Sequence, residues 1–185
     1  MGLIRNNGHD PNAAILIQPN IGLESDVRLP IIKILNTILS NEAVLTLKTR
    51  NAHWNVRGAS FFELHFLYDT QYKQLNDISD EIAERVRMVG GIALGSFAEY
   101  ISNTQLEERP AEVPDIMHLL ADHETIIRYL HEDIRKCDDV YEDEGTSDLM
   151  VSVMRMHEKM AWMLRSYIET EPVIGESQKR SNQDE

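Results

Sequence analysis

The sequence predicts an all-α protein, a four-helix bundle with a long crossover between its second and third helices. Apolar residues recur at helical spacings in four long segments, no segment alternates as a strand does, and the second connection is far longer than a turn. At 185 residues, the chain suits one domain. We expect an irregular N-terminal arm over 1–28, the bundle over 29–171 and a flexible polar C-terminal tail over 172–185.

The first helix is expected to begin near Pro30 and to continue towards Trp54. Its apolar positions recur at steps of three and four residues: Ile31, Ile34, Leu35, Ile38, Val44, Leu45 and Leu47. Gly58 interrupts the pattern. Ser60 then stands three residues before Glu63, which is the capping-box spacing that starts a new helix.

The second helix is expected from Phe61 to Met88, where Gly90-Gly91 stops it. Its stripe consists of Phe61, Leu64, Tyr68, Tyr72, Leu75, Ile78, Ile82 and Val86. The stretch from residue 92 to 114 contains Gly95, Pro110 and Pro114 and is too long for a tight turn. It must therefore cross from one end of the bundle to the other, and a short helix would fit within it.

Two further apolar stripes predict the third and fourth helices. The third consists of Ile116, Leu119, Leu120, Ile126, Ile127, Leu130 and Ile134, and it ends in the acidic segment 138–145. Thr146 or Ser147 is expected to cap the fourth helix, which reaches Glu171-Pro172. Four helices with one long connection have the topology of a ferritin-like bundle.

Composition indicates which partners the chain favours. It carries 31 acidic residues against 18 Lys and Arg, a net charge of −13, which repels nucleic acid and anionic membranes and attracts cations. The longest apolar runs are much shorter than a membrane span. Cys137 is the single cysteine, so no internal disulfide forms; we interpret it as a structural helix residue and expect a cytoplasmic protein.

Two pairs of side chains on the second helix suit a metal ion. His65 and Asp69 are four residues apart and share a face, as do Asp80 and Glu84. Imidazole and carboxylate together bind Fe(II) and Zn(II). Taken alone, each pair is also compatible with an ordinary solvated helix surface.

The spacing of the two pairs excludes one site within one chain. Eleven residues separate Asp69 from Asp80, so both pairs face nearly the same way, but their midpoints lie roughly 22 Å apart along a helix. An antiparallel two-fold mate would bring the first pair of one chain to the second pair of the other. His53 is a further nitrogen donor beside His65, and Asp69 or Glu84 is a candidate for bridging two metal ions.

These residues lie in motifs that resemble the Dps family of mini-ferritins. The likeness rests on the segment Lys48–Gly58 with its His53-Trp54-Asn55 core, on Phe62–His65 with Asp69, on Asp80–Arg85, and on Gly90-Gly91, Ala93–Gly95 and Lys159–Trp162. The resemblance implies a hollow dodecamer with di-iron sites between two-fold partners. It also implies oxidation of Fe(II) by hydrogen peroxide or oxygen, storage of ferric oxide and protection against oxidative damage.

By the same resemblance, the site consists of five ligands and one neighbouring indole: His53, His65, Asp69, Asp80, Glu84 and Trp54. Zinc or another divalent ion could occupy one metal position. Trp54 is a candidate for intercepting stray oxidising equivalents, or alternatively a core or interface aromatic residue. Asp143 and Asp148 are candidates for a three-fold pore through which iron enters.

The chain departs from the family in its tails and in its additional histidines. Many Dps proteins bind DNA through basic tails, whereas here the tails offer only Arg5 and Lys179-Arg180, so DNA binding is doubtful. A nucleoid DNA-binding protein with secondary iron chemistry is the alternative function. We interpret the remaining histidines of the helical part as core, interface or surface residues: His118, His123, His131 and His157.

Overall fold

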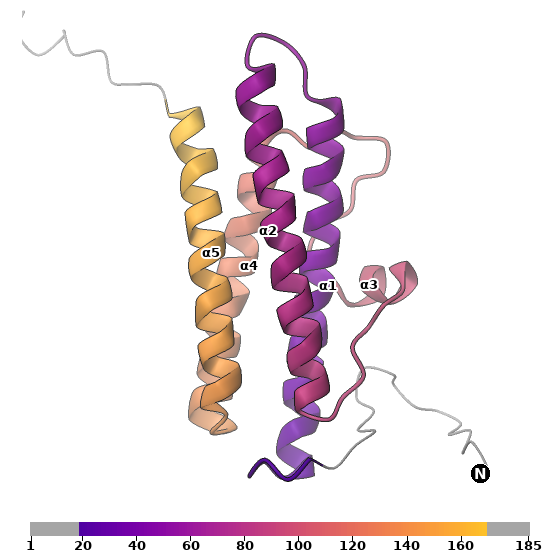
Figure 1. Cartoon of the computed structure of the whole chain (residues 1–185), viewed down its shortest axis with the longest axis vertical. Coiled ribbons are helices and arrows are strands. Elements are labelled where there is room, and N and C mark those ends of the chain that lie inside the picture. Colours follow the sequence, from indigo (N-terminus) through magenta and orange to yellow (C-terminus); the bar gives the residue numbers. More distant parts are fainter. Residues whose placement is uncertain (1–18, 170–185) are drawn as a thin grey trace, which may run out of the picture.

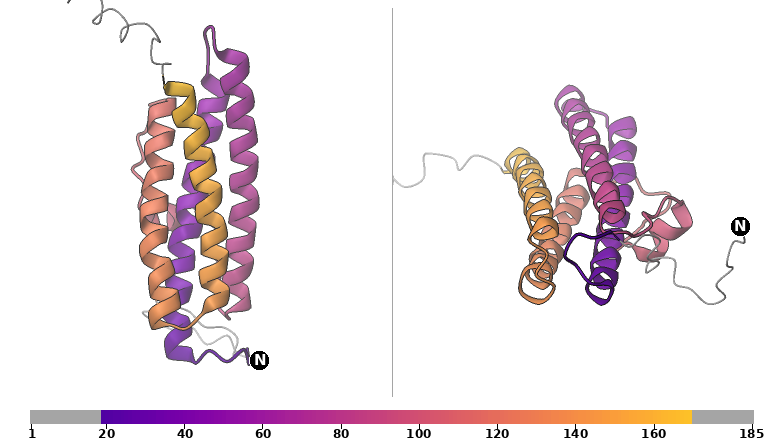
Figure 2. Two further views of the ribbon diagram at one scale, coloured as in Figure 1. Left: turned by 90° about the vertical axis from the view of Figure 1, so that its left-hand side faces the viewer. Right: turned by 60° about the horizontal axis from the view of Figure 1, so that its bottom comes forward.

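The computed structural model describes residues 19–169 and shows four long helices in two antiparallel pairs (Figure 1). Helix α1 (Ser25–Asn55) pairs with α2 (Phe61–Met88), and α4 (Ile116–Arg135) pairs with α5 (Glu144–Ile168). The two pairs lie side by side and bury one core between them (Figure 2). The all-α bundle predicted from the sequence is therefore confirmed.

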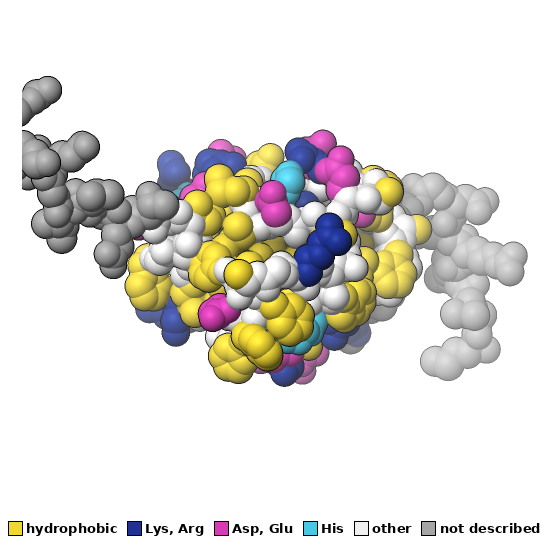
Figure 3. Space-filling model, turned by 90° about the horizontal axis from the view of Figure 1, so that it is seen from above, with side chains coloured by type: hydrophobic (Ala, Val, Ile, Leu, Met, Phe, Trp, Pro, Cys, Tyr) yellow, Lys and Arg dark blue, Asp and Glu magenta, His cyan; other side chains and the backbone are white. Residues whose placement is uncertain are grey.

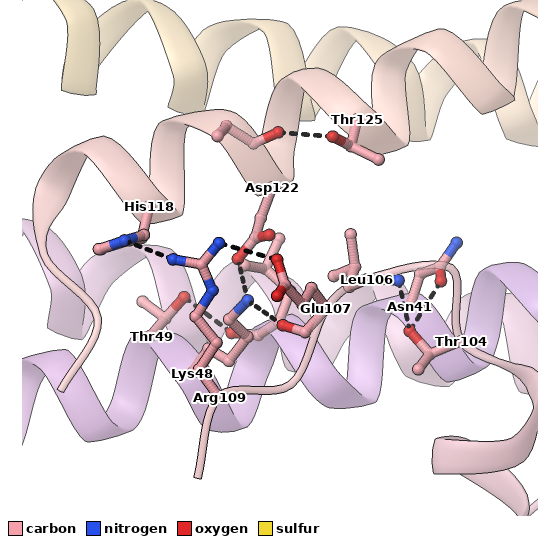
Figure 4. A network of polar contacts seen from close by, with 12 residues as sticks. Asn41, Lys48, Thr49, Thr104, Leu106, Glu107, Arg109, His118, Asp122 and Thr125 are labelled. Atoms are coloured by element: carbon pink, nitrogen blue, oxygen red, sulfur yellow. Dashed lines mark hydrogen bonds and ion pairs between the residues drawn. The ribbon is translucent and has the colours of Figure 1, made fainter. Parts of the chain in front are cut away.

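The crossover between α2 and α4 carries the short helix α3 (Phe97–Asn103), as the sequence permitted. Polar contacts fasten the crossover to the bundle (Figure 4). Asn41 of α1 accepts from the backbone N–H of Gln105 at 2.7 Å, and Lys48 donates to the Glu107 carbonyl at 2.9 Å. Lys48 is also ion-paired with Asp122 of α4 at 2.5 Å, so one side chain joins three segments.

The core is built from the apolar stripes of all four long helices. Its fully enclosed members include Leu35 and Leu45 of α1, Leu75 of α2, Leu119 of α4 and Leu164 of α5, each with no exposed surface. Burying one such side chain contributes about 1.5–3 kcal/mol relative to leaving it in water. The bundle therefore offers a rigid frame for residues on its outer faces.

Helix α1 begins earlier than expected, because Pro30 lies inside it rather than at its start. Arg28 explains the extra turn. It is 2% exposed, and its guanidinium donates to the Ser25 hydroxyl at 3.0 Å and to the Val89 carbonyl at 3.3 Å. Residues 25–28, assigned to the arm from sequence, are thus helical; the rest of the expected arm up to residue 18 and the tail 172–185 lie outside the described residues.

Two predicted helix caps are wrong. Ser60 does precede α2, but its side chain makes no capping hydrogen bond, because its backbone (φ −92°, ψ 22°) is not extended as a capping residue requires. Neither Thr146 nor Ser147 caps α5. Asp143 does, accepting from the Thr146 backbone N–H at 3.0 Å, since Arg85 of α2 holds its carboxylate in place at 2.8 Å.

Candidate metal centre

His53 and His65 meet beside the turn that connects α1 to α2. His53 lies in the last turn of α1, and His65 lies in the second turn of α2. Gly58 turns the chain between them with a φ of +100°, a conformation that glycine adopts without strain. The two imidazole rings stack with their centroids 3.8 Å apart, so the two side chains predicted to supply nitrogen ligands lie next to each other.

Each of these rings is oriented by the backbone of the other helix. His53 Nδ1 donates to the His65 carbonyl at 2.9 Å, and His65 Nδ1 donates to the His53 carbonyl at 3.0 Å. Because a carbonyl only accepts, each Nδ1 carries the hydrogen, and each Nε2 of the neutral ring keeps its lone pair. This is the orientation that metal-binding histidines commonly have.

Asp69 adds a carboxylate one turn further along α2. Its Oδ1 accepts from the Tyr72 hydroxyl at 2.8 Å, and its Oδ2 accepts from Lys73 Nζ at 2.6 Å. The Lys73 hydrogen bond lowers the pKa of Asp69 below its usual value, and the Tyr72 hydrogen bond lowers it further. Asp69 is thus held as a carboxylate, the form in which it binds a metal ion.

Asp80 and Glu84 lie far from the histidines. Both are exposed on α2 and make no side-chain hydrogen bond or ion pair with any described residue. Within residues 19–169, no three or more His, Cys, Asp or Glu side chains converge as a metal site would require. The fold therefore stacks His53 on His65 and places Asp69 one turn further along α2, but it does not gather these three side chains or the second carboxylate pair into one site.

Exposed aromatic side chains surround this region. Trp54 is 65% exposed, and Phe62 and Phe66 on α2 are 80% and 72% exposed. Seen from the end of the bundle that carries the α1–α2 turn, hydrophobic side chains lie at the surface beside histidine (Figure 3). The Phe61 ring stacks on His65 with a centroid distance of 4.9 Å and shields the histidine pair on that side.

The two candidate pore residues have different environments. Asp143 is 4% exposed, and its carboxylate is engaged by Arg85 and by Thr146 at the start of α5. Asp148 is exposed one turn further along the same helix. A pore lined by these residues stays a prediction.

A second group of titratable side chains is enclosed in the core. His157 of α5 donates from Nε2 to Glu42 of α1 at 2.9 Å, and its Nδ1 lies 2.9 Å from Nδ1 of His123 on α4. All three are fully buried. Burial lowers the pKa of His123 well below its usual value, and the neighbouring His157 lowers it further. Of the three environments expected for His123 and His157, which were core, interface or surface, the structure shows the core.

Cys137 is also a core residue, as expected. It has no exposed surface, and burial raises the pKa of its thiol to about 12. The reactive thiolate is therefore scarce at neutral pH.

A pocket of about 380 Å³ between α1, the crossover and α4 includes Lys48 and Asp122 but none of the five candidate ligands.

Sequence reasoning missed the immediate partners of Asp69. The apolar stripe predicts only a packing role for Tyr72, and Lys73 has no predicted role. Both follow Asp69 at i+3 and i+4, the spacings at which helix side chains meet, so this signal was present in the sequence. Arg50 of α1, whose guanidinium carbon lies 5.0 Å from the centre of the Tyr72 ring, had no such local signal.

The antiparallel helices, the interrupted crossover and the imidazole and carboxylate groups on adjacent helices define a ferritin-like protein. The chain matches the ferritin-like domain family over residues 32–173. It is 39% identical over 158 residues to an uncharacterized low temperature-induced protein of Nostoc sp., covering 83% of this chain and 88% of that protein. It is also 37% identical over 153 residues to the DNA protection during starvation protein of Agrobacterium fabrum, covering 80% and 93%.

Solved structures agree with these sequence relatives. DpsC from Streptomyces coelicolor superposes with a TM-score of 0.80 at 31% identity, covering 85% of this chain and 94% of that one. A Dps protein from Vibrio cholerae O1, described as a member of a broad superfamily of ferritin-like diiron-carboxylate proteins, gives 0.77 at 29% identity, covering 82% and 97%. The chain belongs to the Dps family.

Membership of this family supports a broad role in iron storage and oxidative protection, carried out by a homo-oligomer. No helix of the described part combines the length and the apolar character needed to cross a membrane.

Proposed function

We propose that the protein is a ferroxidase and iron-storage subunit that oxidises Fe(II) at a di-iron site shared by two-fold partners. Hydrogen peroxide is the proposed oxidant, and a dodecameric shell retains the ferric oxide. The observation that carries the proposal is the stacked pair His53 and His65, whose Nε2 atoms keep their lone pairs for a metal ion, with the Asp69 carboxylate one turn further along α2. Iron is the substrate of this site, and the protein supplies its ligands.

The outer face of α2 supports a shared site. At about 100° per residue, Phe62, Phe66, Asp69, Asp80 and Glu84 fall on one face of the helix. The two phenyl rings and both distal carboxylates are exposed on it. An exposed apolar patch next to polar ligands is typical of a protein interface. This face therefore suits a second copy of the chain.

Antiparallel packing of two copies of α2 would complete the site. With Asp69 opposite Asp80 of the partner subunit, His65 lies opposite Glu84 of the partner subunit, because the two pairs have the same internal spacing. The same register places Phe62 opposite Arg87 of the partner subunit, one residue from Met88 of the partner subunit, and Phe62 and Met88 are both largely exposed in the single chain. Two-fold symmetry then produces two equivalent sites.

This ligand set suits the reduction of peroxide to water. Two Fe(II) ions held together deliver two electrons to one peroxide, so no one-electron product is released. Carboxylates stabilise the ferric ions that result, and the imidazole ligands maintain the affinity of the site for Fe(II). The net charge of −13 per chain favours the approach of cations.

Peroxide added to Fe(II)-loaded protein tests the proposal. We expect rapid ferric absorbance in the unaltered protein, and its loss when His65→Ala and Asp80→Ala are combined. His131→Ala removes an exposed histidine of α4 and is the matched control. An unchanged rate in the double variant would contradict the proposal.

Metal analysis of the purified protein tests whether zinc occupies one of the two metal positions instead of iron. Cell fractionation tests the expected cytoplasmic location of the protein.

A further inference from the structure

Three buried side chains, Glu42, His157 and His123, form a core triad that links three of the four long helices. Glu42 of α1 accepts from His157 Nε2 of α5 at 2.9 Å, and His157 Nδ1 lies 2.9 Å from Nδ1 of His123 on α4. All three side chains are fully buried. The side chain that α2 contributes one turn further along α5, the Gln71 amide at the Met160 carbonyl, is uncharged.

The charged residues next to His123 in the sequence are engaged with other partners. Asp122 pairs with Lys48 of α1 at 2.5 Å, and Glu124 pairs with Arg165 of α5 at 2.6 Å. Within the described part of the chain, the polar partner of the His123 ring is His157. The ring therefore has a histidine beside it but no carboxylate that would stabilise a positive charge.

The contact between the two imidazoles admits a single hydrogen. Because Nδ1 of one ring faces Nδ1 of the other, one atom must donate and the other must accept. A neutral His157, with its hydrogen on Nε2 against Glu42, accepts from His123. A His157 protonated on both nitrogens instead donates to His123. The core triad thus tolerates one charged imidazole, and the Glu42 carboxylate stabilises that charge on His157.

A positive charge on His123 has no comparable support. Its Nε2 atom is buried and has no hydrogen-bond partner among the described residues, so a hydrogen placed there would be an unsatisfied donor on a charged ring in the core. With both rings charged, two Nδ1–H groups would also face each other across 2.9 Å. A charged His123 is therefore accommodated only when its ring leaves the core.

We propose that the core triad is a proton-operated switch, which holds α4 against α5 and α1 while His123 is neutral and releases α4 when His123 takes up a proton. The proton comes from water and binds at His123 Nε2. Burial lowers the pKa of His123 well below 6.5, and the neighbouring His157 lowers it further, as expected for a ring that is packed only in its neutral form. The inference does not depend on the ferroxidase function.

Amide hydrogen exchange, followed by mass spectrometry, tests the switch. The full chain in its native assembly is labelled at several pH values from about 7.5 to 5, and each rate is corrected for the intrinsic pH dependence of amide exchange. Between pH 6.5 and the lower pKa of folded His123, we expect exchange in the middle of α4 to rise by at least about tenfold per pH unit, because release is coupled to proton uptake. Peptides from the middle of α2 should show no such rise.

A substitution assigns this pH dependence to His123. His123→Asn cannot take up a proton but keeps an amide N–H near the position of Nδ1, so α4 exchange should lose its pH dependence. His131→Asn is the matched control, because His131 is an exposed histidine of the same helix, and here the dependence should persist.

Three results would each overturn the inference. They are corrected α4 exchange that does not change with pH, an equal rise in α2, and a rise that persists in folded His123→Asn. Circular dichroism shows whether His123→Asn is folded. If it is not, the comparison of α4 with α2 in the unaltered protein decides between release of one helix and unfolding of the whole bundle.

Discussion

A complementation experiment tests which chain of a two-fold pair supplies each half of the metal centre. One variant combines His65→Ala with Asp69→Ala, and the other combines Asp80→Ala with Glu84→Ala. Because the two pairs lie roughly 22 Å apart on α2, no single chain can place all four around one site. Each variant alone should therefore be inactive, since every site in its own assembly lacks one half.

Mixed assemblies of the two variants should regain activity. When equal amounts assemble at random, half of the two-fold pairs contain one copy of each variant. In such a pair one site takes its intact halves from both chains, and the other site has both halves damaged. Recovery should thus reach about 25% of the activity of the unaltered protein.

The assay is the initial rate of ferric absorbance after co-expression with two affinity tags. Asp80 and Glu84 are exposed, so their replacement should change stability by no more than about 0.5 kcal/mol, and circular dichroism controls for folding. A mixed assembly no more active than a blend of separately purified variants would refute the shared site. So would substantial activity in either variant alone.

Three further predictions concern the core and the partners. The pKa of folded His123 lies well below its ordinary value of 6.5, so its contribution to stability is complete above about pH 6.5 and is lost as the pH falls towards the folded value; melting curves from pH 7.5 to 5 should show this loss, and His123→Leu should reduce it. Glu42→Ala leaves His157 Nε2 without its acceptor in the core and should cost about 3–5 kcal/mol in denaturant unfolding, whereas Glu42→Gln, which keeps an acceptor oxygen, should cost less; equal losses would contradict the pairing. A gel-shift assay at low salt should show no complex with duplex DNA, and retention that disappears with added salt would support the alternative DNA-binding function.

Features that depend on neighbouring residues could be predicted from sequence. Helix α2 runs over the predicted range Phe61–Met88, because its apolar stripe and the Gly90-Gly91 stop are local signals. The short helix within the crossover was expected for the same kind of reason. The position of His65 and Asp69 on one face followed directly from the helical repeat.

Features that depend on distant partners could not be predicted. The start of α1 at Ser25 depends on Arg28 reaching Val89, and the capping of α5 by Asp143 depends on Arg85 of α2. In each case a local rule favoured another residue. A contact from another helix decided which candidate was used, and no spacing within one segment contains that information.

By itself, the sequence determined the all-α fold, the types of the five candidate ligands and the fact that one chain cannot gather them, because all three follow from residue identity and the helical repeat. Only the tertiary structure decided that His53 and His65 stack with both Nδ1 atoms bound to backbone carbonyls, that the Tyr72 ring stands edge-on to His53, and that Glu42 pairs with His157. The last pair spans 115 residues of sequence. Such contacts depend on how whole helices pack, which local periodicity does not encode.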